Sequence, residues 1–249
     1  MIVLPDKKSE IDTRFQSQSL GVIGAPGVGK SSFFSEDNLL YIQTENGLNA
    51  LSVFKVPCHS WNDYREICSS LMKQKTEGKL NWDGVVIDTI DELVKLADQE
   101  VVSIIKNKFK SKADDVNSIF DYPAASDKGN PAWGWRRDIV MNSLKALQSL
   151  GIAVIYIGHM DFRDIKTPTA VYHKKTISIG GQLGTDLVSW CDHFLTMEST
   201  RVNSETKRVI RTISDSTLDA KSRGNLVPDM FPLSADIKDN WKRFRQLFK

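Results

Sequence analysis

Four short apolar runs, rich in β-branched residues, constrain the fold of this chain more than any other feature. They are LGVI (20–23), LLYI (39–42), GVVI (84–87) and IAVIYI (152–157). None of them alternates between apolar and polar residues, as a strand with one face in water would. Continuous apolar character over such a length is typical of parallel strands that are covered on both faces. The runs therefore predict a largely parallel central sheet.

Helical stretches separate these runs. Apolar residues recur at three- and four-residue steps in 91–109, and we also expect helices over 61–73 and 136–150, the last ended by Gly151. Strands that alternate with helices indicate an α/β fold, with the sheet flanked by helices. The segment 111–135 is rich in Asp, Ser, Pro and Gly, and it is predicted to be a long loop.

The pattern changes in the C-terminal part of the chain. The segments 192–200 and 206–215 predict two antiparallel strands joined by a turn around Asn203, which would extend the sheet. No internal repeat or composition break suggests a domain boundary. We therefore expect one domain over residues 1–249, with its core at about 17–232 and a basic tail at 233–249.

Composition limits the possible environments and partners. The chain of 249 residues is 41% hydrophobic, and no apolar run reaches the roughly 18 residues that a membrane span needs. Its three cysteines show no CxxC spacing, which favours reduced thiols, no zinc site and a cytoplasmic location, that of the host if the protein is viral. A net charge of +2 excludes a polycation, so a nucleic-acid surface would have to be local. The basic segments 106–112, 161–176 and 238–249 are candidates, with an ordinary solvated face as the alternative.

The segment GAPGVGKSS follows the first apolar run directly, and it matches the pattern GxxxxGK[ST]. Glycines allow successive backbone N–H groups to turn inward and form a nest for an anion. Lys30 would reach the β- and γ-phosphates of a nucleotide, and the Ser31 hydroxyl would ligate Mg²⁺. The expected phosphate-binding residues are Gly24, Ala25, Pro26, Gly27, Val28, Gly29, Lys30, Ser31 and Ser32. The alternative is a glycine-rich turn with an incidental lysine.

Two carboxylates follow other apolar runs. Asp88 stands at the end of GVVID, where an acid typically holds Mg²⁺ together with the P-loop hydroxyl, although it could instead cap the next helix. Glu45 follows LLYIQT, beside the P-loop strand. There it lies within reach of a water molecule at the γ-phosphate, as a general base must, with an ordinary loop acid as the alternative.

At this point the sequence resembles the RecA-like superfamily of P-loop ATPases, on the motifs GAPGVGKS, GVVID and LLYIQTE. The resemblance implies that Glu45 polarises the attacking water. It also implies that His159, at the end of IAVIYIGH, senses the γ-phosphate, and that the segment 160–180 lies where this family binds DNA. Lys221 and Arg223, in AKSRG, correspond to a K-x-R pair that reaches the nucleotide of a neighbouring subunit. A capping histidine, a solvated loop and a plain basic turn are the respective alternatives.

Over about residues 17–232 the chain is similar to small phage-type RecA-like ATPases, a group that includes single-strand annealing proteins. The resemblance implies a Mg²⁺-dependent ATPase that acts on single-stranded DNA in recombination or annealing. It implies self-association into a ring or short filament, with ATP at the subunit interface and no membrane partner. A long filament is not expected, because no helix-hairpin-helix domain or FxxA segment is found.

Other functions use the same phosphate cradle. The alternative that we keep is an ATPase module whose nucleotide state controls a protein partner, without DNA. A small-molecule kinase is not favoured because no arginine-rich lid is found, nor is a GTPase, because no NKxD segment is found. Trp133, Trp135 and Trp241 could stack on bases, although packing against the core is the commoner role of such residues.

Overall fold

The computed structural model describes residues 6–8, 10–122, 130–166, 171–202 and 205–248. These residues form a sheet of ten strands whose main path has the order β10-β8-β7-β1-β5-β4-β2-β3, with β6 paired to β5 and β9 paired to β7. The strands are β1 (Ser19–Gly24), β2 (Leu39–Gln43), β3 (Phe54–Pro57), β4 (Gly84–Asp88), β5 (Ala153–Lys166), β6 (Val171–Ile177), β7 (His193–Val202), β8 (Glu205–Arg211), β9 (Lys221–Ser222) and β10 (Met230–Leu233).

The middle of the sheet is parallel. All pairings from β3 through β2, β4, β5 and β1 to β7 run in the same direction, whereas β6, β8, β9 and β10 pair antiparallel. Every residue of β1 and β4 is buried, as expected of strands with helices on both sides. The predicted α/β fold, with a mainly parallel sheet and an antiparallel C-terminal extension, is confirmed.

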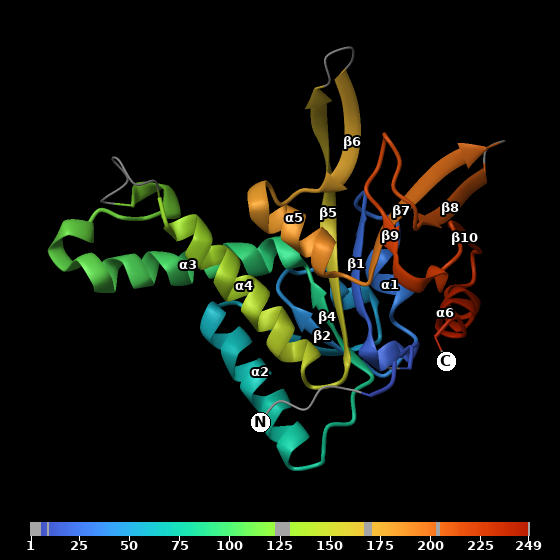
Figure 1. Cartoon of the computed structure of the whole chain (residues 1–249), viewed down its shortest axis with the longest axis horizontal. Helices are drawn as coiled ribbons and strands as arrows, with labels where there is room; N and C mark the ends of the chain where they lie inside the picture. Colours follow the sequence, from blue (N-terminus) through green and yellow to red (C-terminus); the bar gives the residue numbers. More distant parts are fainter. Residues whose placement is uncertain (1–5, 9, 123–129, 167–170, 203–204, 249) are drawn as a thin grey trace.

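Helices cover both faces of this sheet (Figure 1). They are α1 (Lys30–Phe33), α2 (Trp61–Thr76), α3 (Ile90–Phe109), α4 (Ala132–Gln148), α5 (Gly181–Trp190) and α6 (Ile237–Arg245). One apolar cluster joins the sheet to α2, α3, α4 and α5. A second cluster joins the other face to α1 and α6. No helix in the described part of the chain is long and apolar enough to cross a membrane.

The region 111–135 is less open than predicted. It contains 3-10 turns at Lys110–Ala113 and Ile119–Asp121, and α4 begins at Ala132. Val101 and Ile105 of α3 pack with Ala113, Val116, Ile119 and Ala132 in a small apolar cluster of their own. This cluster explains why α3 and α4 extend together beyond the sheet in Figure 1. The stretch 123–129 of the predicted loop lies outside the described residues.

The basic C-terminal tail predicted at 233–249 contains α6 and packs against the core. Asp236 accepts hydrogen bonds from the backbone N–H groups of Lys238 and Asp239 and so caps α6. Trp241, Phe244 and Phe248 are buried against Phe15 and α1. Stacking of Trp241 on a nucleic-acid base is therefore excluded in this arrangement. Trp133, by contrast, remains partly exposed beside Phe120.

The expected loop at 160–180 is largely a β-hairpin, which we call the arm. Strand β5 continues past the edge of the sheet, and its residues Met160–Lys166 pair antiparallel with Val171–Ile177 of β6. Figure 1 shows the arm standing away from the body of the molecule. The segment VYHKKTI shows no alternation of apolar and polar residues, so the sequence carried no clear strand signal there. Residues 167–170 lie outside the described part.

Candidate functional site

The P-loop connects β1 to a helix of a single turn, as predicted. Gly27 and Gly29 have φ values of 74° and 101°, a left-handed backbone that glycine adopts without strain. A Cβ atom on Gly24 would lie 2.5 Å from the carbonyl oxygen of Met197 on β7, so this position has no room for a side chain. The hydroxyl of Tyr41 donates to the carbonyl of Ser31 at 2.8 Å and ties α1 to β2.

Lys30 points back into its own loop. Its Nζ donates to the carbonyl oxygens of Gly24 at 2.8 Å and Ala25 at 3.2 Å. Burial lowers the pKa of Lys30, and the nearby Asp88 carboxylate opposes that shift. The ammonium group is thus preorganised at the centre of the loop, where phosphate oxygens could replace the two carbonyls.

Asp88 lies at the carboxyl end of β4, with its side chain buried beside the P-loop. Burial raises the pKa of its carboxyl group, whereas a hydrogen bond with the Ser31 side chain lowers it. The two residues predicted to hold Mg²⁺ therefore lie near each other in one cleft. Their chemistry, one carboxylate and one hydroxyl, fits a cation that keeps several waters and phosphate oxygens in its shell.

Glu45 lies across the same cleft, but its strand β2 is not beside the P-loop strand as predicted, because β4 and β5 lie between β2 and β1. Two threonines fix the loop that carries it. The Thr89 hydroxyl donates to the Glu45 carboxylate at 3.3 Å, and the Thr44 hydroxyl donates to the Thr89 carbonyl at 2.8 Å. The backbone N–H groups of Thr44 and Glu45 also donate to the Asp88 carbonyl. Sequence reasoning missed both threonines, although the QTE and DT segments that contain them were the segments that it used.

His159 completes the cleft from β5. Asp91, in the first turn of α3, accepts hydrogen bonds from the His159 backbone N–H at 2.8 Å and from the Ser178 hydroxyl, and it lies 3.2 Å from His159 Nδ1. A Cβ on Gly158 would lie 3.5 Å from the Asp91 carboxylate and 3.2 Å from Ile90, so the strand passes close to α3 here. Asp91 therefore joins the base of the arm, on both of its strands, to the helix that follows Asp88.

Together these residues line a cleft of about 320 Å³ beside the P-loop. Lys30 and Ser31 come from the P-loop, Glu45 from the end of β2, Asp88 from the end of β4 and His159 from β5. The carboxyl ends of parallel strands meet at one edge of a sheet, which is why residues so distant in sequence converge here.

Lys221 and Arg223 lie away from this cleft. Lys221 is paired with Phe194 near the beginning of β7, whereas the P-loop follows Gly24, which is paired with Met197. Lys221 donates to the carbonyl oxygens of Val188 and Ser189 at the end of α5. Arg223 donates to Ser189 and forms an ion pair with Asp192 at 3.0 Å. Within one chain, these cations thus lie toward the amino-terminal ends of the parallel strands, whereas the P-loop lies at the carboxyl ends.

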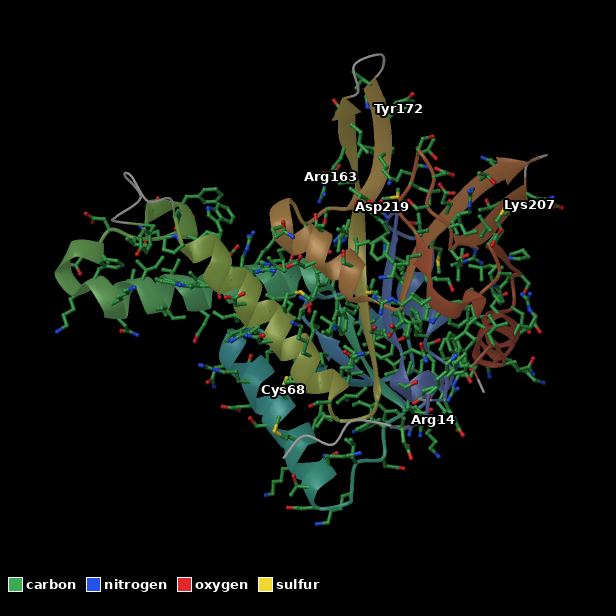
Figure 2. All side chains as sticks on the ribbon, viewed as in Figure 1. Arg14, Cys68, Arg163, Tyr172, Lys207 and Asp219 are labelled. Atoms are coloured by element: carbon green, nitrogen blue, oxygen red, sulfur yellow. The ribbon has the colours of Figure 1, made fainter. Side chains whose placement is uncertain are left out.

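The arm carries most of its charges in pairs within the molecule. Lys174 lies 2.7 Å from Asp219, and Lys175 lies 2.6 Å from Glu198. Figure 2 shows Arg163 near the base of the arm, Asp219 beside that base and Tyr172 further out. The exposed apolar side chains of the arm are Phe162, Ile165, Val171 and Tyr172, which are 57%, 41%, 54% and 44% exposed.

The cysteines take no part in this site. Burial raises the pKa of all three thiols, so each stays protonated at neutral pH. All three are free. Among the described residues, no group of three or more His, Cys, Asp and Glu side chains is placed to hold a metal ion by itself.

One protein family and two known proteins are similar to this chain. A family model described as an AAA domain matches residues 16–224. The SPbeta prophage-derived uncharacterized protein YorG of Bacillus subtilis is 24% identical over 146 residues, which are 58% of this chain and 41% of that protein. The match thus spans less than half the length of that relative. A KaiC-like protein from the archaeon Pyrococcus horikoshii has a TM-score of 0.48 at 11% identity, over 90% of this chain and 88% of that one.

The family match covers the P-loop, the strands that carry Asp88 and Glu45, and the chain as far as Gly224. Since it spans most of the sequence, this chain belongs to the AAA domain family and contains an AAA-type P-loop ATPase domain.

Proposed function

We propose that this chain is a Mg²⁺-dependent, RecA-like ATPase of phage type that acts on single-stranded DNA. The observation that carries the hydrolytic part is the convergence of Lys30, Asp88 and Glu45 from three separate segments on one cleft. Lys30 would bind the phosphates, and Ser31 with Asp88 would hold Mg²⁺, which supplies neutralisation of the phosphate charge. Glu45 would accept a proton from the attacking water, and the Thr89 hydroxyl orients its carboxylate.

His159 would sense the terminal phosphate and transmit its presence to the arm. It lines the cleft on β5, and the same strand continues as the first strand of the arm. Asp91 connects His159 to Ser178 at the return of β6. A shift of His159 on phosphate binding would therefore move both strands of the arm, through the backbone of β5 and through the hydrogen bonds of Asp91.

Lys221 and Arg223 would act on the nucleotide of a second copy. Their position at the far edge of the sheet supports this role, because they cannot reach the P-loop of their own chain in this arrangement. A heterologous contact between copies would generate a ring or a short filament with ATP between subunits. An arginine supplied by a neighbour stabilises charge that develops on the transferred phosphoryl group.

The arm would contact single-stranded DNA mainly by stacking. Phe162 and Tyr172 are exposed, and aromatic side chains accept the faces of any base. The similarity to a prophage-derived protein supports a phage origin.

A second candidate is control of a protein partner by the nucleotide state. The ion pairs of Lys174 and Lys175 favour it, because they engage two cations of the arm while its four large apolar side chains stay exposed. An apolar surface of this kind is typical of protein contacts.

One experiment separates the two candidates. ATP turnover and binding of fluorescein-labelled oligo(dT) are measured over a series of salt concentrations, for the parent and for Tyr172→Ala. DNA action requires stimulated turnover, salt-dependent binding and weaker binding by the variant. Val171→Ala is the matched control, since it removes an apolar arm residue that cannot stack. Turnover that does not respond to DNA, with no salt-dependent binding, would exclude the DNA function and leave the partner-protein function.

A further inference from the structure

Arg208 of β8 is a second cation beside the P-loop, on the side opposite to the cleft. Met197 of β7 stands in register between Gly24 of β1 and Ile210 of β8. Arg208 is two residues away from Ile210 on β8 and pairs with Ser199. Its backbone therefore lies about 7 Å beyond the row that contains Gly24, at the height where the P-loop leaves the sheet.

The side chain of Arg208 points toward the P-loop. Residues two apart on a strand share a face, and Ile210 is buried in the cluster that contains Val28 of the P-loop and Phe33 of α1. A Cβ placed on Gly29 would lie 3.0 Å from a guanidinium nitrogen of Arg208. The guanidinium group is thus adjacent to the loop residue that precedes Lys30.

Arg208 is half-buried, and within the described ranges its side chain has no hydrogen-bond or ion-pair partner. Arg211 on the same strand differs, since it forms an ion pair with Asp215 at 3.2 Å. A partly desolvated guanidinium without an anion is unfavourable, and its fork of donors matches a phosphate group. The surroundings of Arg208 therefore suit an anionic ligand held at the P-loop.

We propose that Arg208 binds the phosphate chain of the nucleotide from within the same chain. This inference rests on the proposed function, because it requires that the P-loop holds a nucleoside triphosphate. Glu45, Asp88 and His159 come from β2, β4 and β5, on one side of β1, whereas Arg208 comes from β8, on the other side. Arg208 is thus remote from the attacking water, and it contributes to nucleotide affinity more than to the rate of the chemical step.

The test measures the affinity for the fluorescent nucleotides mant-ATP and mant-ADP with Mg²⁺. We expect Arg208→Ala to weaken binding of both about tenfold, the effect of losing one charge-assisted contact. Arg208→Lys should recover part of the affinity because it restores the charge. Lys207→Ala is the matched control, because Lys207 directly precedes Arg208 in the sequence. Figure 2 shows Lys207 on the β7–β8 hairpin. The Lys207→Ala variant should bind both nucleotides as the parent does. In Arg208→Ala, kcat at saturating ATP should fall by a smaller factor than the affinity for the nucleotide.

The outcomes separate this inference from the proposed function. If the parent binds mant-ATP and Lys30→Ala does not, but Arg208→Ala binds like the parent, Arg208 has no role in binding and only this inference fails. If the parent binds no nucleotide, the proposed function itself fails. Thermal unfolding without nucleotide checks the fold, and Arg208→Gln, which keeps most of the side-chain length, replaces the alanine variant if that variant is unstable.

Discussion

The carboxylate of Asp91 offers a sharp test of the coupling between the nucleotide cleft and the arm. Its two oxygens face the backbone N–H and ring of His159 and the hydroxyl of Ser178. In Asp91→Asn the side chain keeps its size but loses its charge and one acceptor oxygen. A hydrogen bond to a charged group contributes about 1.5–3 kcal/mol, so we expect a loss of about 2 kcal/mol at the base of the arm.

That loss should affect the coupling more than the binding of nucleotide. Asp91 lies outside the P-loop, so KM for ATP should change less than about threefold, whereas a misplaced His159 should lower kcat about tenfold. Limited trypsin digestion reports on the arm through cleavage at Arg163, Lys174 and Lys175. In the parent, a non-hydrolysable ATP analogue should slow this cleavage, and in Asp91→Asn the protection should be lost.

Glu92→Gln is the control for this experiment, since Glu92 is the next residue on α3 and, among the described residues, forms its ion pair with the exposed Lys95. It should behave as the parent in both assays. Parental kcat together with parental protection of the arm in Asp91→Asn would refute the coupling.

Three further predictions concern assembly and stability. Burial lowers the pKa of His193 to about 4, so the unfolded chain binds the extra proton between about pH 6.5 and 4, and stability falls as the pH drops through that range. Urea unfolding at pH 4.5 should show a loss of roughly 2–3 kcal/mol relative to pH 7 in the parent and not in His193→Gln. An equal loss in both proteins would contradict the assignment. Phe244→Ala should lower the free energy of unfolding by about 3–5 kcal/mol, whereas Lys242→Ala should leave it unchanged. A parental free energy of unfolding in Phe244→Ala would mean that α6 is not part of the core. An equimolar mixture of Lys30→Ala and Arg223→Ala chains should regain about a quarter of the parental turnover, since a random assembly pairs an intact P-loop with an intact neighbouring arginine at that frequency, and no recovery would argue against action between subunits.

Features with local signals could be predicted from the sequence. The P-loop pattern needs only eight consecutive residues, and the four apolar runs each became a buried parallel strand. The convergence of Asp88 and Glu45 followed from one geometric rule, that the carboxyl ends of parallel strands share an edge. These steps require no knowledge of which side chains meet.

Features that depend on contacts between distant segments could not be predicted in this way. Asp91 and His159 are 68 positions apart in sequence. Arg208 reaches Gly29 because the sheet places β8 only one strand, β7, away from β1. The C-terminal helix had a signal that was overlooked: Trp241, Phe244 and Phe248 recur at helical spacing, but the charges around them suggested a solvated tail. The arm was missed because VYHKKTI lacks the apolar–polar alternation that marks a strand, and its basic residues suggested a loop.

Nucleotide binding and turnover in Lys30→Ala and Glu45→Gln test the central claim most directly. Both are measured on purified protein with Mg²⁺, by mant-ATP fluorescence and by release of phosphate. We predict that Lys30→Ala no longer binds the nucleotide, whereas Glu45→Gln binds it with parental affinity and hydrolyses it at least a hundredfold more slowly, as expected for loss of a general base. Hydrolysis by Glu45→Gln at the parental rate would contradict the account.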